Sequence, residues 1–211
     1  MTQRSERSEP GTDLDLEAVC AKGWVERSDL TEAEFGRAVE FYAAMRRHDG
    51  RLEEVRATAA QMVTQWTGRV PRDVGSFGIG LNLEASDLDL GIGLAPEQRP
   101  ELFEALEGHA RFLGERQTRF STSRLVFAFE VDGVEIDLSA LTEEDFVVAC
   151  RMLDQIGRSM THQERVCHTW VKHLLRTAGR LDAYASWKLT TYARFCPEFN
   201  WVPIPEKPGG A

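Results

Sequence analysis

Hydrophobic residues recur at two different spacings along this chain, and the changes of spacing predict where helices and strands lie. In residues 29–48 and again in residues 51–66 the apolar positions return every three or four residues, as on one face of a helix. The Asp-Gly pair at 49–50 separates the two stretches, and Ser28 or Asp29 is expected to cap the first. We interpret both apolar stripes as core-facing rather than as ligand contacts.

The middle of the chain has the shorter period that is typical of strands. Residues 86–94 are predicted to form a strand after a glycine-rich turn, and residues 124–130 and 134–138 a hairpin around an Asp-Gly turn. Between them, two prolines are expected to open a helix over residues 96–116. These elements predict a mixed sheet of four or five strands flanked by helices.

After the hairpin the pattern becomes helical. Helices are predicted over residues 142–159, 161–178 and 182–196, the last one stopped by the proline that follows it. Thr142 is expected to cap the first of them and Asp182 the last. Thr161 and Glu164 have the spacing of a capping box at the start of the second helix. A strand-containing segment followed by helices is α+β or α/β in character, with a small helical bundle at the C-terminal end.

The two ends of the chain are polar or rich in proline and glycine. Residues 1–15 are expected to be a disordered tail, and residues 200–211 a flexible one. The polar start is unlike a signal peptide and no apolar run is long enough for a membrane span, so a cytoplasmic protein is expected. The four cysteines form no Cys-x-x-Cys pair, and reduced thiols are expected.

Charge is distributed unevenly along the chain. The formal net charge of -9 disfavours non-specific binding to a long polyanion such as DNA. Residues 165–194 differ, because they contain six lysines and arginines and one acid, Asp182. A basic helical region inside an acidic protein suits a small anionic ligand such as a triphosphate.

Candidate chemistry is concentrated in residues 75–90. Asp87 and Asp89 are two positions apart on a predicted strand, so their side chains point to the same face and can bind one cation together. Ahead of them, Gly75 and Ser76 begin a small-residue turn whose backbone N–H groups can approach an anion closely. This turn is expected to hold a phosphate.

A third carboxylate comes from the predicted hairpin. Asp137 lies between Ile136 and Leu138, where an apolar residue would be expected, and an isolated carboxylate is costly to bury. Two acids compete with it: Asp132 is better explained by the turn, whereas Glu135 shares the strand face of Asp137. Three converging acids beside an anion-binding turn predict a site for Mg²⁺ or Mn²⁺ and a nucleoside triphosphate.

The Gly-Ser turn followed by Asp87-Leu88-Asp89 resembles the signature of the DNA polymerase β-type nucleotidyltransferase superfamily. The resemblance implies an α+β fold in which the turn holds the triphosphate and the paired acids, with Asp137, bind two metal ions. Residues 75–90 look most like terminal uridylyltransferases, poly(A) polymerases and 2′-5′ oligoadenylate synthases. The same spacing also occurs in minimal bacterial nucleotidyltransferases and in antibiotic-modifying ones.

Residues 170–173 and 182–185 resemble the helical region of 2′-5′ oligoadenylate synthases and terminal nucleotidyltransferases. The resemblance implies that Lys172 and Arg176, four residues apart on one helix, contact the triphosphate and that Tyr184 stacks on the base. From the residues alone, Tyr184 is equally compatible with a core position, and the two cations with a solvated helix face. The chain is much shorter than most members of these families.

The resemblance divides the chain into residues 16–140, a nucleotidyltransferase domain with N-terminal helices, and residues 141–199, a helical nucleotide-binding region. The implied activity moves a nucleoside monophosphate from an NTP such as ATP to a hydroxyl acceptor, with release of pyrophosphate. The acceptor would be an RNA or oligonucleotide end, or a nucleotide. Two alternatives stay open: nucleotidylation of a small molecule such as an antibiotic or a biosynthetic intermediate, and a non-catalytic nucleotide-sensing or antitoxin-like module.

A zinc site is the other metal hypothesis that the sequence raises. His162, Cys167, His168 and His173 lie within twelve residues of one another. Their spacing matches no standard structural zinc site, and residues five apart on a helix point in different directions. Zinc is therefore not expected here.

Overall fold

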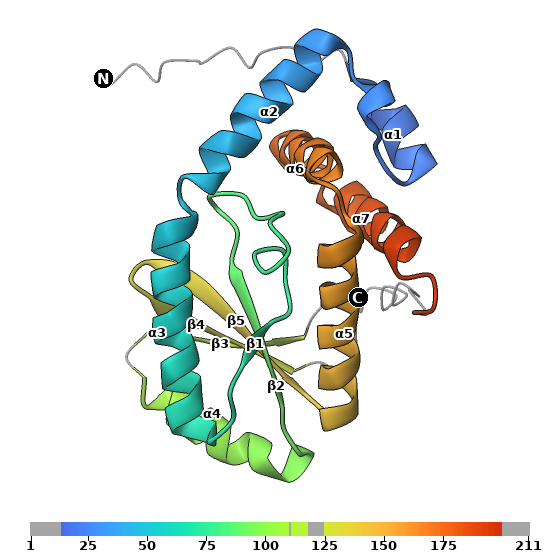
Figure 1. Ribbon diagram of the computed structural model, residues 1–211. Coiled ribbons are helices and arrows are strands. Elements are labelled where there is room, and N and C mark those ends of the chain that lie inside the picture. Colours follow the sequence, from blue (N-terminus) through green and yellow to red (C-terminus); the bar gives the residue numbers. More distant parts are fainter. Residues whose placement is uncertain (1–13, 110, 118–124, 200–211) are drawn as a thin grey trace, which may run out of the picture.

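The computed structural model describes residues 14–109, 111–117 and 125–199 of the 211-residue chain (Figure 1). The two predicted tails lie outside the described residues, except for residues 14 and 15. Within the described ranges, no helix is both long and apolar enough to cross a membrane.

The described strands form one mixed sheet in the order β1-β2-β5-β4-β3. Strand β2 pairs with β5 in parallel, and the other neighbouring strands pair antiparallel. This arrangement confirms the predicted mixed sheet and the α+β class. The strands are β1 (Arg72–Asp73), β2 (Leu88–Gly93), β3 (Phe112–Gln117), β4 (Leu125–Val131) and β5 (Val134–Leu141).

Strands β4 and β5 form the predicted hairpin. Asp132 and Gly133 both have positive φ, at 49° and 79°. Positive φ at two successive central residues is the geometry that a tight antiparallel hairpin requires, and Asp-Gly is one of the pairs that adopt it readily. The turn therefore accounts for Asp132 without a role in chemistry.

One face of the sheet is covered by α3 (Asp49–Thr67) and α4 (Arg99–Glu107). Apolar side chains of β2, β4 and β5 point to this face and form a continuous core with the two helices. Helix α5 (Glu143–Ser159) packs against β2 and β5, and Figure 1 shows it across the sheet from α3. The alternation along β2 consequently leaves the opposite set of its side chains directed away from α3 and α4.

The helix expected over residues 96–116 is wrong in its second half. A 3₁₀ turn (η2, Pro96–Gln98) and α4 are present, but α4 ends at Glu107 and β3 follows. Strand β3 is an edge strand that pairs with β4, with Phe112 partly buried against Phe103 and Leu113 exposed. Because its backbone partners are distant in sequence, local periodicity does not reveal it.

Four helices form a separate helical layer at the top of Figure 1. Helix α2 packs against α6, and α7 packs against both α6 and α1. The short helix α1 was not predicted from the pattern, and the domain boundary at residue 140 stays a prediction. The four are α1 (Leu16–Lys22), α2 (Glu32–Arg46), α6 (His162–Thr177) and α7 (Leu181–Phe195).

Helix caps were predicted with mixed success. The Thr142 hydroxyl accepts a hydrogen bond from the Asp145 backbone N–H, and Thr161 with Glu164 forms the expected capping box. The cap of α2 is Thr31 and not Ser28 or Asp29, which belong to the 3₁₀ turn η1 (Arg27–Asp29).

Asp29 is unavailable as a helix cap because it accepts hydrogen bonds from the Lys22 ammonium and the Glu26 N–H. The predicted Asp182 cap is also wrong, since α7 begins one residue earlier, at Leu181, and its N-cap is Arg180. Asp182 lies in the first turn, where a negative charge still favours the helix.

Candidate active site

The three predicted acids meet on the face of the sheet that α3 and α4 leave open. Asp89 on β2 and Asp137 on β5 are direct neighbours across the parallel strand pair, and Asp87 lies just before β2. One carboxylate oxygen from each lies within 4.8 Å of the others, and all three are partly exposed. Leu88 and Leu90, which alternate with the acids, are buried in the core beneath.

The structure also distinguishes Asp137 from its competitors. Neither Glu135 nor Asp132 joins the group of acids among the described residues. Ile136 and Leu138 are fully buried on the α3 side, so Asp137 points to the opposite face. An acid is tolerated between two core residues because its side chain lies on the other face of the strand, where it stays partly exposed.

The donor set suits a hard divalent cation. Carboxylate oxygens are the ligands that Mg²⁺ and Mn²⁺ prefer, and three lie close enough to share an ion. The four residues of the zinc hypothesis do not form a comparable group: Cys167 and His168 are buried, whereas His162 is exposed. The three grouped carboxylates thus agree with the predicted site for a cation that prefers oxygen ligands.

The Gly-Ser turn lies directly against the acids. A Cβ added to Gly75 would overlap the Asp89 carboxylate, so this position requires glycine for close approach. The Val74 N–H donates to the Asp89 carbonyl at 2.9 Å and holds the start of the turn beside β2. Ser76 follows and is buried.

Beyond the turn, four consecutive carbonyls are each held by a different side chain. Arg165 Nε donates to Ile79 O at 3.1 Å, and Tyr42 Oη donates to Gly80 O at 3.2 Å. The carbonyls of Leu81 and Asn82 accept from Lys172 Nζ at 2.9 Å and from Arg46 Nη2 at 2.8 Å. A loop without secondary structure is therefore fixed from the helical layer.

Lys172 connects helix α6 to this loop. Its side chain is 3% exposed, and Nζ donates to Ser76 Oγ at 3.1 Å and to Ser86 Oγ at 3.4 Å, in addition to Leu81 O. Three acceptors match the three protons of an ammonium group. Lys172 therefore lies beside the serine that the sequence assigns to phosphate binding.

Burial lowers the pKa of Lys172 to about 7, with further lowering by Lys188 and Arg176 and opposition from Asp89 and Asp87. A cation kept out of water is less favourable than its neutral form, which is the dominant cause. An added anion near Nζ would favour the charged form of Lys172.

Arg176 and Tyr184 lie at the rim of the same region. Arg176 is exposed one turn after Lys172 on α6. Tyr184 on α7 is partly buried against the core of the helical layer, and Lys172 Nζ lies 5.9 Å from its ring centroid. Burial raises the pKa of Tyr184, which keeps the phenol neutral. The Tyr184 ring thus packs partly against the core of the helical layer, as expected for a core position, and it also lies near the Lys172 ammonium group.

Two residues of this region were given no individual role in the sequence interpretation. Ser86 is buried, accepts the Leu83 N–H at 2.9 Å and receives Lys172. Lys188 lies one turn after Tyr184 on α7 and acts electrostatically on Lys172. Lys188 follows Tyr184 by four residues, so the two share a face of α7, and this spacing could have indicated that Lys188 lies near Lys172.

No protein-family model matches the chain, and no curated protein matches it either. Solved structures do match. A cytoplasmic RNA terminal U-transferase aligns with a TM-score of 0.56 at 14% identity, over 77% of this chain and 52% of that one. The GLD-2/RNP-8 complex aligns with a TM-score of 0.54 at 13% identity, over 80% and 68% of the two chains.

The polymerase core of TRAMP, an RNA surveillance complex, aligns with a TM-score of 0.53 at 17% identity, over 83% of this chain and 62% of that one. The chain therefore spans about half to two thirds of the length of these structures. At these identities the likeness is one of fold. The chain has the fold of the polymerase β-type nucleotidyltransferases, and its three acids lie together on the face of the sheet opposite α3 and α4.

Proposed function

We propose that this protein is a metal-dependent nucleotidyltransferase that moves a nucleoside monophosphate from an NTP to a hydroxyl acceptor and releases pyrophosphate. The observation that carries the proposal is the meeting of Asp87, Asp89 and Asp137 within 4.8 Å, beside a turn whose Gly75 touches Asp89. The structures that share this fold include a cytoplasmic RNA terminal U-transferase and the polymerase core of TRAMP, which supports the same reaction class.

The three acids would hold Mg²⁺ or Mn²⁺. Bound there, the metal would neutralise triphosphate charge and lower the pKa of the acceptor hydroxyl. In the reaction, the acceptor oxygen forms a bond to the α-phosphorus while the bond from that phosphorus to the bridging oxygen of pyrophosphate breaks. The acceptor proton leaves with the help of Asp137, and pyrophosphate carries away the electron pair of the broken bond.

The remaining predicted residues position the triphosphate. Ser76 and the backbone N–H groups of its turn steady the β- and γ-phosphates, and Lys172 Nζ lies 3.1 Å from Ser76 Oγ. Arg176, exposed one turn along α6, offsets charge on the leaving pyrophosphate. Tyr184 offers its ring to the base. Catalysis of this kind consists mainly of positioning and charge neutralisation.

The test is incubation with each labelled NTP and Mg²⁺ or Mn²⁺, with pyrophosphate release and label transfer as readouts. Separate arms contain a short RNA, a mononucleotide, an aminoglycoside as a small-molecule acceptor, or no acceptor. Asp137→Asn should abolish transfer without changing the thermal unfolding temperature. Glu135→Gln, on the same strand face, is the matched control and should retain it. If NTP binds with Mg²⁺ but no acceptor releases pyrophosphate, the protein is a nucleotide-binding module without this activity.

A further inference from the structure

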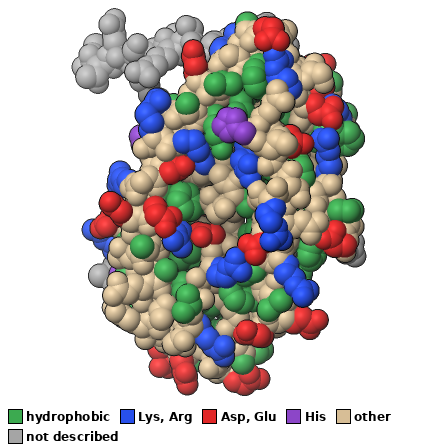
Figure 2. All heavy atoms as spheres, viewed as in Figure 1, with side chains coloured by type: hydrophobic (Ala, Val, Ile, Leu, Met, Phe, Trp, Pro, Cys, Tyr) green, Lys and Arg blue, Asp and Glu red, His purple; other side chains and the backbone are tan. Residues whose placement is uncertain are grey.

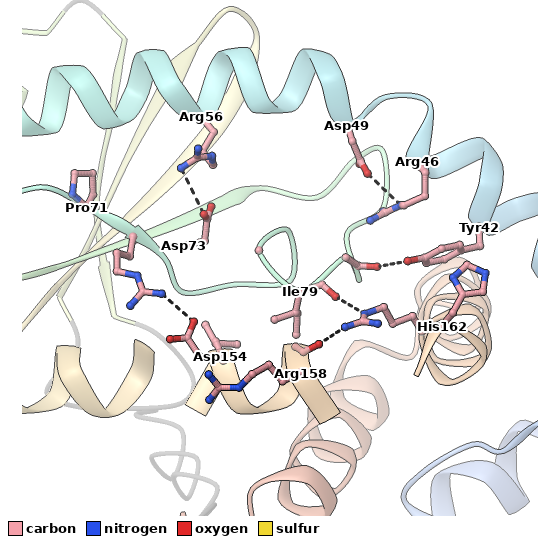
Figure 3. Close-up of a pocket in the computed structure, with 16 residues that line it drawn as sticks. Tyr42, Arg46, Asp49, Arg56, Pro71, Asp73, Ile79, Asp154, Arg158 and His162 are labelled. Carbon is pink, nitrogen blue, oxygen red and sulfur yellow. Dashed lines mark hydrogen bonds and ion pairs between the residues drawn. The ribbon is translucent and has the colours of Figure 1, made fainter. Parts of the chain in front are cut away.

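A cavity of about 840 Å³ opens between α3, α5 and the start of α6, and none of the eight predicted site residues lines it. Figure 2 shows a hollow in this face with basic and acidic side chains gathered around it. Figure 3 shows its lining residues. Gly78, Ile79 and Gly80, from the loop after the Gly-Ser turn, form part of the wall. The cavity therefore borders the candidate active site but is separate from it.

Arginine is the most frequent residue in this cavity. Three of the five arginines are neutralised by neighbouring acids across distances of 2.8–3.5 Å. Paired in this way, they contribute hydrogen-bond donors and little net charge. The pairs are Arg46 with Asp49, Arg56 with Asp73 and Arg72 with Asp154.

Two arginines have no such compensation. Arg165 donates to the carbonyls of Ile79 and Gly157 and forms no ion pair among the described residues. Arg158, exposed near the end of α5, has neither an ion pair nor a hydrogen bond in the described part of the chain. The protein has a formal net charge of -9, but these two arginines give one wall of the cavity a local positive charge. This charge favours the binding of an anion.

The rest of the lining suits an organic ligand. Tyr42 and His162 meet edge to face with ring centroids 5.4 Å apart, and Ile79 and Leu153 add apolar surface. The volume falls in the range of small-molecule sites, roughly 300–1,000 Å³. Guanidinium groups bind phosphate oxygens with two parallel hydrogen bonds, which a surface of lysines does not provide.

We propose that this cavity binds a small phosphate-bearing anion, such as a nucleotide or a polyphosphate, independently of the three acids. A small ligand fits better than a long nucleic acid, because Asp49, Asp73 and Asp154 line the cavity and the whole chain is acidic. The proposal stands apart from the transferase activity, since it uses none of that site's residues.

The test is calorimetric titration of the full chain with sodium tripolyphosphate, and separately with ATP, in EDTA so that metal-dependent binding to the acids is excluded. Arg158→Glu should weaken tripolyphosphate binding by at least about tenfold, because it removes one charge-assisted contact and adds a charge that repels the anion. Arg158 is preferred over Arg165, because Arg165 also holds the loop through Ile79 O.

Two further variants make the test specific. Arg151→Glu changes the same charge on the same helix, but Arg151 does not line the cavity, so this variant should bind as the wild type does. Arg176→Glu should also bind normally, because Arg176 belongs to the proposed transferase site and does not line this cavity. Equal weakening by Arg151→Glu and Arg158→Glu would overturn the proposal, as would binding of a 5′-triphosphorylated oligonucleotide without binding of either small anion.

Discussion

Gly75 offers a direct test of how closely the turn and the acids are packed. In Gly75→Ala the new methyl group would overlap the Asp89 carboxylate and its Cβ, so either the turn or Asp89 must move. The φ of Gly75 is not positive, so the substitution acts through space and not through backbone strain. The change is the smallest one that alters the contact without altering any charge.

Two consequences follow from the overlap. Inserting a methyl group into such a contact typically destabilises a fold by about 1–3 kcal/mol. A displacement of Asp89 by about 1 Å would lower the rate of a positioned reaction by about 100-fold. We therefore expect Gly75→Ala to lose stability, metal affinity and transferase activity together.

The assay combines urea unfolding in EDTA, followed by far-UV circular dichroism, with Mn²⁺ titration of the folded protein. Gly36→Ala is the matched control, because Gly36 lies inside helix α2 with no atom within 4 Å of an added Cβ. It should stabilise the fold by about 0.5–1 kcal/mol and leave Mn²⁺ binding unchanged. If Gly75→Ala matches the wild type in both stability and Mn²⁺ affinity, the described contact with Asp89 is wrong.

Two further predictions concern buried titratable groups. Burial lowers the pKa of Lys172 to about 7, so above pH 7 the unfolded state binds up to one more proton than the folded state. The free energy of unfolding should therefore rise between pH 7 and 8.5, with a slope that approaches ~1 kcal/mol per pH unit at the upper end. Lys172→Met should flatten this rise in a series of urea unfolding curves; an unchanged slope would contradict the lowered pKa of the buried lysine. Burial, with Lys172 and Lys188, lowers the pKa of His168 well below its usual value, so the unfolded state gains a proton first and acid should destabilise the fold between pH 6.5 and 5. His168→Phe should reduce that loss, measured as the urea midpoint at both pH values, and equal losses in both proteins would refute it.

Features encoded within a few residues were predicted well. The hydroxyl caps at Thr142 and Thr161 depend on hydrogen bonds to backbone groups three residues away, which the sequence specifies directly. The Asp-Gly hairpin turn is equally local, because both of its residues adopt the positive φ that the turn requires. The direction of Asp89, opposite to Leu88 and Leu90, follows from the two-residue period of a strand.

Errors arose where a distant segment supplies the partner. Strand β3 satisfies its backbone groups on β4, so a helix expected to about residue 116 gave way to an edge strand. Asp29 was expected to cap α2, but Lys22 and the Glu26 N–H already engage its carboxylate. In both cases a tertiary or neighbouring interaction outweighs local helix preference.

The sequence alone identified the residues to which we assign the proposed chemistry: Asp87 and Asp89 by their spacing, the Gly-Ser turn ahead of them, and Asp137 as a polar exception within an apolar strand. The tertiary structure decided that Asp137, and not Glu135, meets them, because parallel pairing of β2 with β5 places Asp137 beside Asp89. It also decided that Lys172 is buried against the turn and that arginines from separate helices line one cavity. Periodicity records the direction of a side chain relative to its own element, whereas contacts between elements depend on how the whole chain packs.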